Sequence, residues 1–207
     1  NKSLDFNDVI HDVRTSFKKI RAFILLLKTE LGEDVYKNET RCFRAEGKGI
    51  AELRDSYVVL MTLELLAVKY PDQLRNNTVN AVQNKLTAGY EAKKNFVLEQ
   101  DELTKQAGRL LTVKNRVTGW SLPENGGDLI FDRLKECYEK GRSQMTDAKT
   151  DKTDKRLHNW RKIVKHLWYQ VRVFEPFNPE ILIPFDESLH SLSDFLGEDH
   201  DLAVPVS

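Results

Sequence analysis

The chain has 207 residues, of which 40% are hydrophobic and 31% charged, and its formal net charge is zero. A chain of this length and composition folds as one globular domain or as two closely joined halves. Its longest uninterrupted apolar run, Ala22 to Leu27, is far too short to span a membrane. No signal peptide opens the sequence, and Cys42 and Cys137 are too few and too far apart for a disulfide framework. We therefore expect a cytoplasmic protein without a membrane partner.

Glycines and prolines divide the sequence into segments with helical periodicity, and no segment alternates with a period of two. In chain order, helices are predicted over 5–31 and 33–70, the second with a bend at Gly47 and Gly49. Two further helices are expected within 72–120, with Gly89 as a candidate boundary. The remaining helices are predicted over 128–148, 155–174 and 181–196. The predicted connections are 121–127, 149–154 and the proline-rich 175–179. The sequence thus predicts an all-α fold.

An internal repeat is visible in the polar residues. Pairs 147 positions apart are His11/His158, Arg14/Arg161 and Lys18/Lys165, and pairs 146 positions apart are Arg44/His190, Glu52/Glu198 and Asp55/Asp201. Two sets in the same order with nearly the same offset indicate a duplicated helical unit. We expect two antiparallel helical bundles related by a pseudo-two-fold axis. They would form a single domain, 1–207, with approximate halves 1–120 and 121–207.

Each copy opens with a helix that carries cations on one face. A helix advances about 100° per residue, so residues three or four apart share a face. The first stripe spans roughly 80° and the second roughly 100°, and their members are His11, Arg14, Lys18 and Arg21, then His158, Arg161, Lys162, Lys165 and Tyr169. Apolar residues occupy the opposite face of both helices. Each helix is therefore predicted to have a hydrophobic anchor and a cationic stripe.

A solvated helix face is the simplest interpretation of such a stripe, but solvated faces usually mix both signs. Like charges one turn apart, as in Arg14/Lys18 and Arg161/Lys165, repel by about 0.2–0.5 kcal/mol. The segment 155–172 holds six Lys or Arg and no acid, whereas 175–201 holds eight Asp or Glu and no Lys or Arg. This local asymmetry favours an anionic ligand despite the zero net charge.

Catalytic and metal-binding motifs are missing from the sequence. There is no GxSxG, no glycine-rich phosphate loop of the GxxxxGK[ST] type, and no carboxylate cluster for Mg²⁺. Neither His11 nor His158 has a Cys, His or carboxylate partner at a recognised metal-ligand spacing. We therefore expect no metal, no cofactor and no enzymatic activity.

Motifs in both halves resemble those of one family. The first copy, HDVRTSFKKIRAFILLL (11–27), is similar to H-x-x-R-x-x-x-[KR]-[KR]-x-R, and LRDSYVVL (53–60) is similar to R-D-x-x-V. In the second copy, LHNWRKIVKHLWYQVRVF (157–174) resembles L-H-x-W-R-K-x-V-K-x-x-W-Y-Q. YEKGRSQM (138–145) and LHSLSDFLGEDHDLAV (189–204) resemble the preceding and closing segments. By these motifs the chain is similar to the CHAD domain, the conserved histidine alpha-helical domain, over essentially its whole length.

The resemblance implies two four-helix bundles with basic residues lining a shared groove, and binding of inorganic polyphosphate without catalysis. Phosphate or sulfate would occupy the same site. The binding residues carried over by position are His11, Arg14, Lys18, Lys19, Arg21, Arg44, Lys48, Arg54, Tyr138, Arg142, His158, Arg161, Lys162, Lys165, Tyr169 and His190. Two departures stand out: Asp194 occupies the repeat position of Lys48, and the helix that precedes the first motif is absent or reduced to 1–9.

Other functions remain open at this stage. One is an accessory domain or an enzyme of phosphate-ester or triphosphate metabolism, and another is a nucleic-acid binder. Nucleic acid is the less expected ligand because only Tyr169 among the aromatic residues falls within a basic stripe. Polyphosphate binding would place the protein at polyphosphate granules, where protein partners are also expected.

Overall fold

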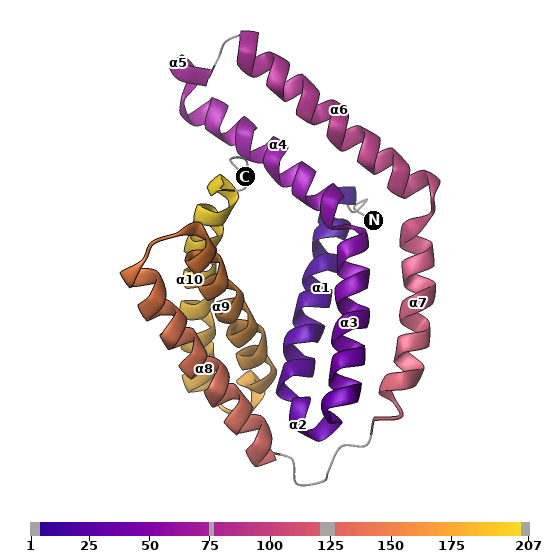
Figure 1. Cartoon of the computed structure of the whole chain (residues 1–207), viewed down its shortest axis with the longest axis vertical. Coiled ribbons are helices and arrows are strands. Elements are labelled where there is room, and N and C mark those ends of the chain that lie inside the picture. Colours follow the sequence, from indigo (N-terminus) through magenta and orange to yellow (C-terminus); the bar gives the residue numbers. More distant parts are fainter. Residues whose placement is uncertain (1–4, 75–76, 121–126, 204–207) are drawn as a thin grey trace. The chain divides into compact units, whose positions relative to one another are not determined.

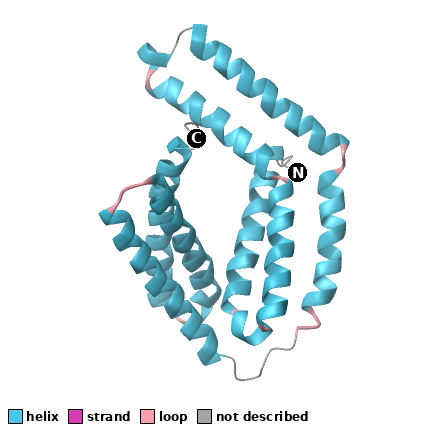
Figure 2. Ribbon diagram, viewed as in Figure 1, coloured by secondary structure: helices cyan, strands magenta, loops and turns pink. Residues whose placement is uncertain are grey.

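A computed structural model describes residues 5–74, 77–120 and 127–203 of the chain. Over these residues the structure is helical, and Figure 2 shows no strand among them. The elements are α1 (Phe6–Leu26), α2 (Lys28–Leu31), α3 (Glu33–Gly49), α4 (Ala51–Lys69), α5 (Pro71–Leu74), α6 (Asn77–Glu99), α7 (Glu102–Val117), α8 (Gly127–Thr150), α9 (Asp154–Phe174), the short 3-10 helix η1 (Glu175–Phe177) and α10 (Pro179–Ala203) (Figure 1). The all-α prediction is confirmed.

The helix breaks follow glycine and proline in most places. α2 ends before Gly32, whose φ of 75° lies in the left-handed region that glycine tolerates. The bend predicted at Gly47 and Gly49 is present, with Ile50 between α3 and α4. α10 begins with Pro179, because proline fits the first turn of a helix, where its missing N–H is not needed.

Two boundaries were predicted wrongly. Gly89 lies inside α6 and not at a helix end, because a single glycine costs a helix only about 1 kcal/mol and the neighbouring Tyr90 is buried in the core. The true boundary is at Asp101, which has a left-handed φ of 50°. The last helix runs to Ala203, beyond the predicted end at residue 196. The predicted loop 121–127 lies outside the described residues, except for Gly127, which opens α8.

The chain packs as two compact units. The first comprises Asn1–Thr15 and Ala45–Trp120, and the second comprises Ser16–Arg44 and Ser121–Ser207. The predicted halves share the division at residue 120 but differ in the placement of 16–44. That segment groups with the second unit, where Nε2 of Gln170 donates to the Ala22 carbonyl at 2.9 Å.

In the first unit, α4 packs against α5 and α6, and α6 continues to α7 (Figure 1). Its hydrophobic core consists of Ile10, Ile50, Leu53, Leu60, Tyr90 and Val97. A polar contact adds to it: Nε of Arg109 donates to Oε1 of Glu46 at 2.8 Å, and Gln106 donates to the Glu46 carbonyl at 2.9 Å. These bonds tie α7 to the last turn of α3.

In the second unit, α9 packs against both α8 and α10 (Figure 1). The core formed there consists of Cys137, Val164, Leu167, Val171, Leu189 and Leu196, with Trp160 and Trp168 packed against it. Burial raises the pKa of the Cys137 thiol to about 11, so this cysteine acts as a small apolar side chain. Across the described part of the chain, no helix has the length and apolar character needed to cross a bilayer.

Candidate functional site

The first basic stripe lies along α1. His11 and Lys19 are exposed, whereas Arg14, Lys18 and Arg21 are half-buried. The chain passes from one unit to the other within this helix, so His11 and Arg14 belong to the first unit and the remaining three to the second. The residues of the stripe therefore differ in both exposure and surroundings.

Arg14 is held by two partners on α4. Its Nη1 donates to Oδ1 of Asp55 at 2.8 Å and to the Ala51 carbonyl at 3.2 Å. The Arg14 side chain is only 17% exposed, while that of Asp55 is 60% exposed. The guanidinium thus faces a carboxylate and the first turn of α4, and its charge is largely compensated.

Arg21 has a different environment, in the second unit. Burial lowers the pKa of its guanidinium, the nearby Arg44 lowers it further, and Tyr36 acts in the opposite direction. The Nε atom of Arg21 is buried and makes no hydrogen bond to the described residues. Arg21 is therefore a half-buried cation whose Nε lacks a hydrogen bond to the described residues and whose charge is disfavoured by the nearby Arg44.

Cations from α1, α8 and α9 act on His166 of α9. Burial, followed in order by the charges of Arg21, Lys140 and Lys162, lowers the pKa of His166 to about 4. The imidazole is therefore neutral near pH 7. The contributions of Arg21, Lys140 and Lys162 to this pKa indicate that three cations lie near His166.

Gln170 sets the register between α1 and α9. It is 1% exposed, and its bond to the carbonyl of Ala22 lies next to Arg21 in the sequence. Lys162, His166 and Gln170 are spaced by one turn each, so they share one face of α9. The bond from Gln170 thus joins the backbone next to Arg21 to the face of α9 that carries Lys162.

The other cations of the second stripe on α9 differ in their exposure. Lys162 is exposed, and His158, Arg161 and Lys165 are half-buried. A β-carbon placed on Gly197 of α10 would lie 3.2 Å from Nη2 of Arg161, so the guanidinium lies directly on the backbone of α10. The Nε atom of Arg161 is buried and has no hydrogen-bond partner among the described residues.

Tyr169 departs from its predicted surroundings. It is only 6% exposed, and its ring lies 5.0 Å from that of Trp168. Burial raises the pKa of its hydroxyl, against the opposing effect of Arg161 and Arg172. Its angle on the helix predicted that Tyr169 would lie among the exposed cations, but its side chain is covered by neighbouring residues.

His190 lies on α10 and is exposed. Its ring stacks on the indole of Trp168 at 4.3 Å with an interplanar angle of 13°, and its Nε2 is 3.4 Å from Oδ2 of Asp194. Trp168 was expected to serve in packing, and it is indeed packed against the second core. A stacked ring with a carboxylate beside it gives His190 a defined orientation.

The remaining predicted residues are distributed over both units. Arg44, Lys48, Tyr138 and Arg142 are exposed, and Arg54 is half-buried over the ring of Tyr57, 5.3 Å from its centroid. Arg44, Tyr138 and Arg142 belong to the second unit, whereas Lys48 and Arg54 belong to the first. Lys48 and Arg54 thus belong to a different unit from Arg21, Lys140 and Lys162.

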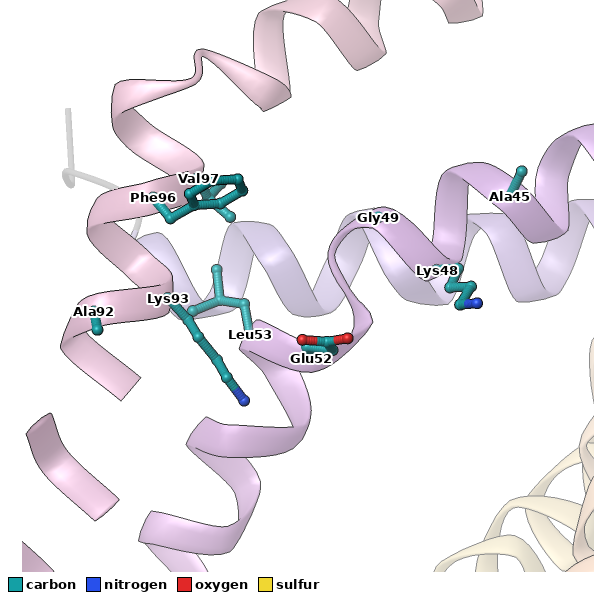
Figure 3. Close-up of a pocket in the computed structure, with 9 residues that line it drawn as sticks. All are labelled: Ala45, Lys48, Gly49, Glu52, Leu53, Ala92, Lys93, Phe96 and Val97. Carbon is teal, nitrogen blue, oxygen red and sulfur yellow. The ribbon is translucent and has the colours of Figure 1, made fainter. Parts of the chain in front are cut away.

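Lys48 instead lines a pocket of about 730 Å³ in the first unit. Figure 3 shows Phe96 and Val97 of α6 above Leu53 of α4, with Lys48, Glu52 and Lys93 around them. The Nζ of Lys93 donates to Oγ of Ser56 at 2.7 Å. The lining is mainly apolar and the charged residues carry both signs, so this pocket lacks the excess of cations seen around His166.

Sequence reasoning missed His166 and Lys140. Both lie within the quoted motif segments, and His166 follows Lys162 by one helical turn. That spacing was the available signal for His166. For Lys140 no such signal exists, because its approach to His166 depends on how α8 packs against α9.

The chain matches the family model described as CHAD domain over residues 3–206, which is nearly its whole length. The chain belongs to the CHAD family. Comparisons with curated proteins and with solved structures gave no match. The CHAD match covers both motif copies and all of the predicted binding residues.

Proposed function

We propose that this CHAD protein binds inorganic polyphosphate along the cations of its two motif copies, without catalysing a reaction. The observation that carries the proposal is the positive cluster in the second unit. There Arg21 and Lys162, one from each copy, act with Lys140 on a neutral His166, and Arg44 lies near Arg21. An anion placed among these groups would relieve their mutual repulsion.

Linear polyphosphate suits such a cluster because it presents closely spaced negative charges in a row. Several cations can then contact one chain and release its counterions, as in proteins that bind nucleic acid. Arginine offers forked donors to phosphate oxygens, and lysine adds a mobile point charge. A single phosphate or sulfate would reach fewer of the cations and bind more weakly.

The proposal extends to the architecture. We infer that the duplication produced two four-helix bundles related by a pseudo-two-fold axis. In its support, corresponding arginines make similar contacts: Arg14 meets Ala51 at the start of α4, and Arg161 meets Gly197, which lies 146 positions after Ala51. Association with polyphosphate granules and with partners located there belongs to the same proposal.

A binding assay with charge-reversed variants tests the proposed function. In the site variant Arg44→Glu is combined with Lys162→Glu, because both side chains are exposed and both belong to the cluster. In the control Lys149→Glu is combined with Lys152→Glu, which makes the same change in net charge at exposed positions near the end of α8. Binding of long-chain polyphosphate is measured by fluorescence anisotropy over a range of salt concentrations.

We expect the site variant to lose roughly a hundredfold in affinity, since two charge-assisted contacts become repulsive, and the control to lose much less. Affinity of the unaltered chain should fall steeply with salt, and polyphosphate should outcompete pyrophosphate and single-stranded nucleic acid. Equal losses in site variant and control would attribute binding to net charge alone. Preferential binding of nucleic acid would overturn the assignment of the ligand.

A further inference from the structure

The arginine of each H-x-x-R motif ends against the second helix of its own repeat. In the first unit, Nη1 of Arg14 donates to the carbonyl of Ala51 and to Asp55. Ala51 and Asp55 lie one turn apart at the start of α4, so a single guanidinium joins α1 to α4 at two points. With 17% of its side chain exposed, Arg14 offers little surface to an external ligand.

The second unit repeats this contact at the corresponding place. Arg161 follows Arg14 by 147 positions, and Gly197 follows Ala51 by 146. The Nη2, Nε and Cζ atoms of Arg161 lie 3.2, 3.5 and 3.8 Å from the place of a β-carbon on Gly197. Because glycine has no side chain, the guanidinium can lie flat against the buried backbone of α10. Alanine at this position would require the Arg161 guanidinium to shift by a few tenths of an ångström.

The other cations of the motifs differ from these two arginines. His11, Lys19 and Lys162 are exposed, and each lies within five residues of one of the arginines on the same helix. Rotation or displacement of α1 or α9 would move these side chains together. A contact that holds the helix therefore controls where its exposed cations point.

We propose that Arg14 and Arg161 brace the two motif helices, and that Asp55 and Gly197 are positioning residues for the polyphosphate site. The exposed cations touch the ligand, and the arginines fix the helices that carry them. The functional part of this inference rests on the proposed function. The bracing contact between Arg14 and Asp55 does not, because it can be measured without a ligand.

The brace is tested first by a double-mutant cycle with Arg14→Ala, Asp55→Ala and both changes together, followed by denaturant unfolding. We expect each single change to lower the unfolding midpoint and the double change to lower it by less than their sum, since both remove one contact. Strictly additive effects would overturn the brace. If the unaltered chain fails to bind polyphosphate, the proposed function falls, while this cycle still decides the brace.

Polyphosphate binding by the same variants separates bracing from direct contact. A direct contact at Arg14 would be freed when Asp55 is removed, so Asp55→Ala would raise the affinity, whereas a brace predicts a lower affinity. Arg14→Ala should also leave the dependence of affinity on salt unchanged. Lys19→Ala should reduce the slope by roughly 0.7–0.9, the contribution of one neutralised cation. A rise in affinity for Asp55→Ala, or an equal loss of slope for Arg14→Ala, would overturn the proposal.

Gly197→Ala tests the second copy, with Gly89→Ala as its matched control. Both glycines lie within helices, but a β-carbon on Gly89 meets nothing within 4 Å. Both variants therefore gain helix propensity, but only Gly197→Ala requires Arg161 to shift. We expect Gly197→Ala to weaken polyphosphate binding by roughly threefold to tenfold with an unchanged salt slope, and Gly89→Ala to have no effect. Equal affinities of the two variants would contradict the role assigned to Gly197.

Discussion

α4 receives the motif arginine Arg14 and α9 carries the motif arginine Arg161, yet the two helices are packed very differently. α9 buries Val164, Leu167, Tyr169, Gln170 and Val171, whereas α4 buries Leu53 and Leu60. At the far end of α4, Leu65 and Val68 are 67% and 74% exposed. In the first unit the motif arginine has a carboxylate partner, and in the second the cations crowd around a neutral histidine. The more densely packed helix is therefore the one whose cations lie near a neutral histidine and not beside a carboxylate partner.

The largest expected difference between the two helices is in the stability lost when a leucine is replaced by alanine. Leu167→Ala removes a side chain that is 4% exposed, and it should lower the free energy of unfolding by about 2–5 kcal/mol. Leu65→Ala makes the same change where the side chain is 67% exposed, so its effect should stay within about 0.5 kcal/mol. Denaturant unfolding of both variants measures the contrast. Similar losses would show that α4 is covered in solution.

A second contrast is in the response to acid. The folded state holds the pKa of His166 at about 4, below its reference value of 6.5, so between these values the unfolded chain binds more protons. Stability from the neutral imidazole is therefore fully present above pH 6.5 and is lost as the pH falls toward 4. The loss should approach 3 kcal/mol in total.

His166→Gln provides the control for this effect, because glutamine does not titrate in that range. Unfolding of both proteins is followed at several pH values between 4 and 7.5, and the difference between the two curves isolates His166 from the carboxylates. A difference that is independent of pH would mean that folding does not change the pKa of His166.

A smaller effect on stability is expected when a buried glutamine is replaced in each unit. Gln170 makes one hydrogen bond, to the Ala22 carbonyl, and Gln106 donates both to the carbonyl of Glu46 and, at 3.3 Å, to its Oε2 atom. Gln170→Leu should therefore cost about 1 kcal/mol, and Gln106→Leu about 2 kcal/mol, because it leaves a buried carboxylate with one donor fewer. Thermal or denaturant unfolding shows which of the two variants loses more stability. The opposite order would mean that the register between α1 and α9 contributes more than one hydrogen bond.

The smallest expected effects come from cations over aromatic rings. Arg54 lies 5.3 Å from the centroid of Tyr57 in the first unit, and Arg172 lies 5.7 Å from that of Trp168 in the second. Arg54→Gln should cost about 0.5 kcal/mol. Arg172→Gln should cost slightly more, since Arg172 also lies 3.8 Å from Asp186. Equal unfolding midpoints for both variants would show that the acidic neighbour adds nothing.

Most helix positions could be predicted from the sequence because the signals are local. Periodicity, together with the breaks at Gly32, near Gly49 and at Pro179, depends on residues only a few places apart. The same locality explains the error at Gly89: one glycine cannot outweigh the burial of its neighbour in a distant core. The division of the chain into units could not be predicted from local signals, since it depends on contacts between residues far apart in the sequence, such as Gln170 and Ala22.

By itself, the sequence determined that the chain is helical, belongs by its motifs to the CHAD family, and carries two basic faces. Only the tertiary structure decided which of those cations are compensated and which are not. Arg14 and Arg21 have equal weight on a helical wheel, yet one meets Asp55 from 41 positions away and the other meets Arg44. The physical reason is that the charge, exposure and pKa of a side chain depend on the neighbouring helix, and periodicity along one helix contains no information about that neighbour.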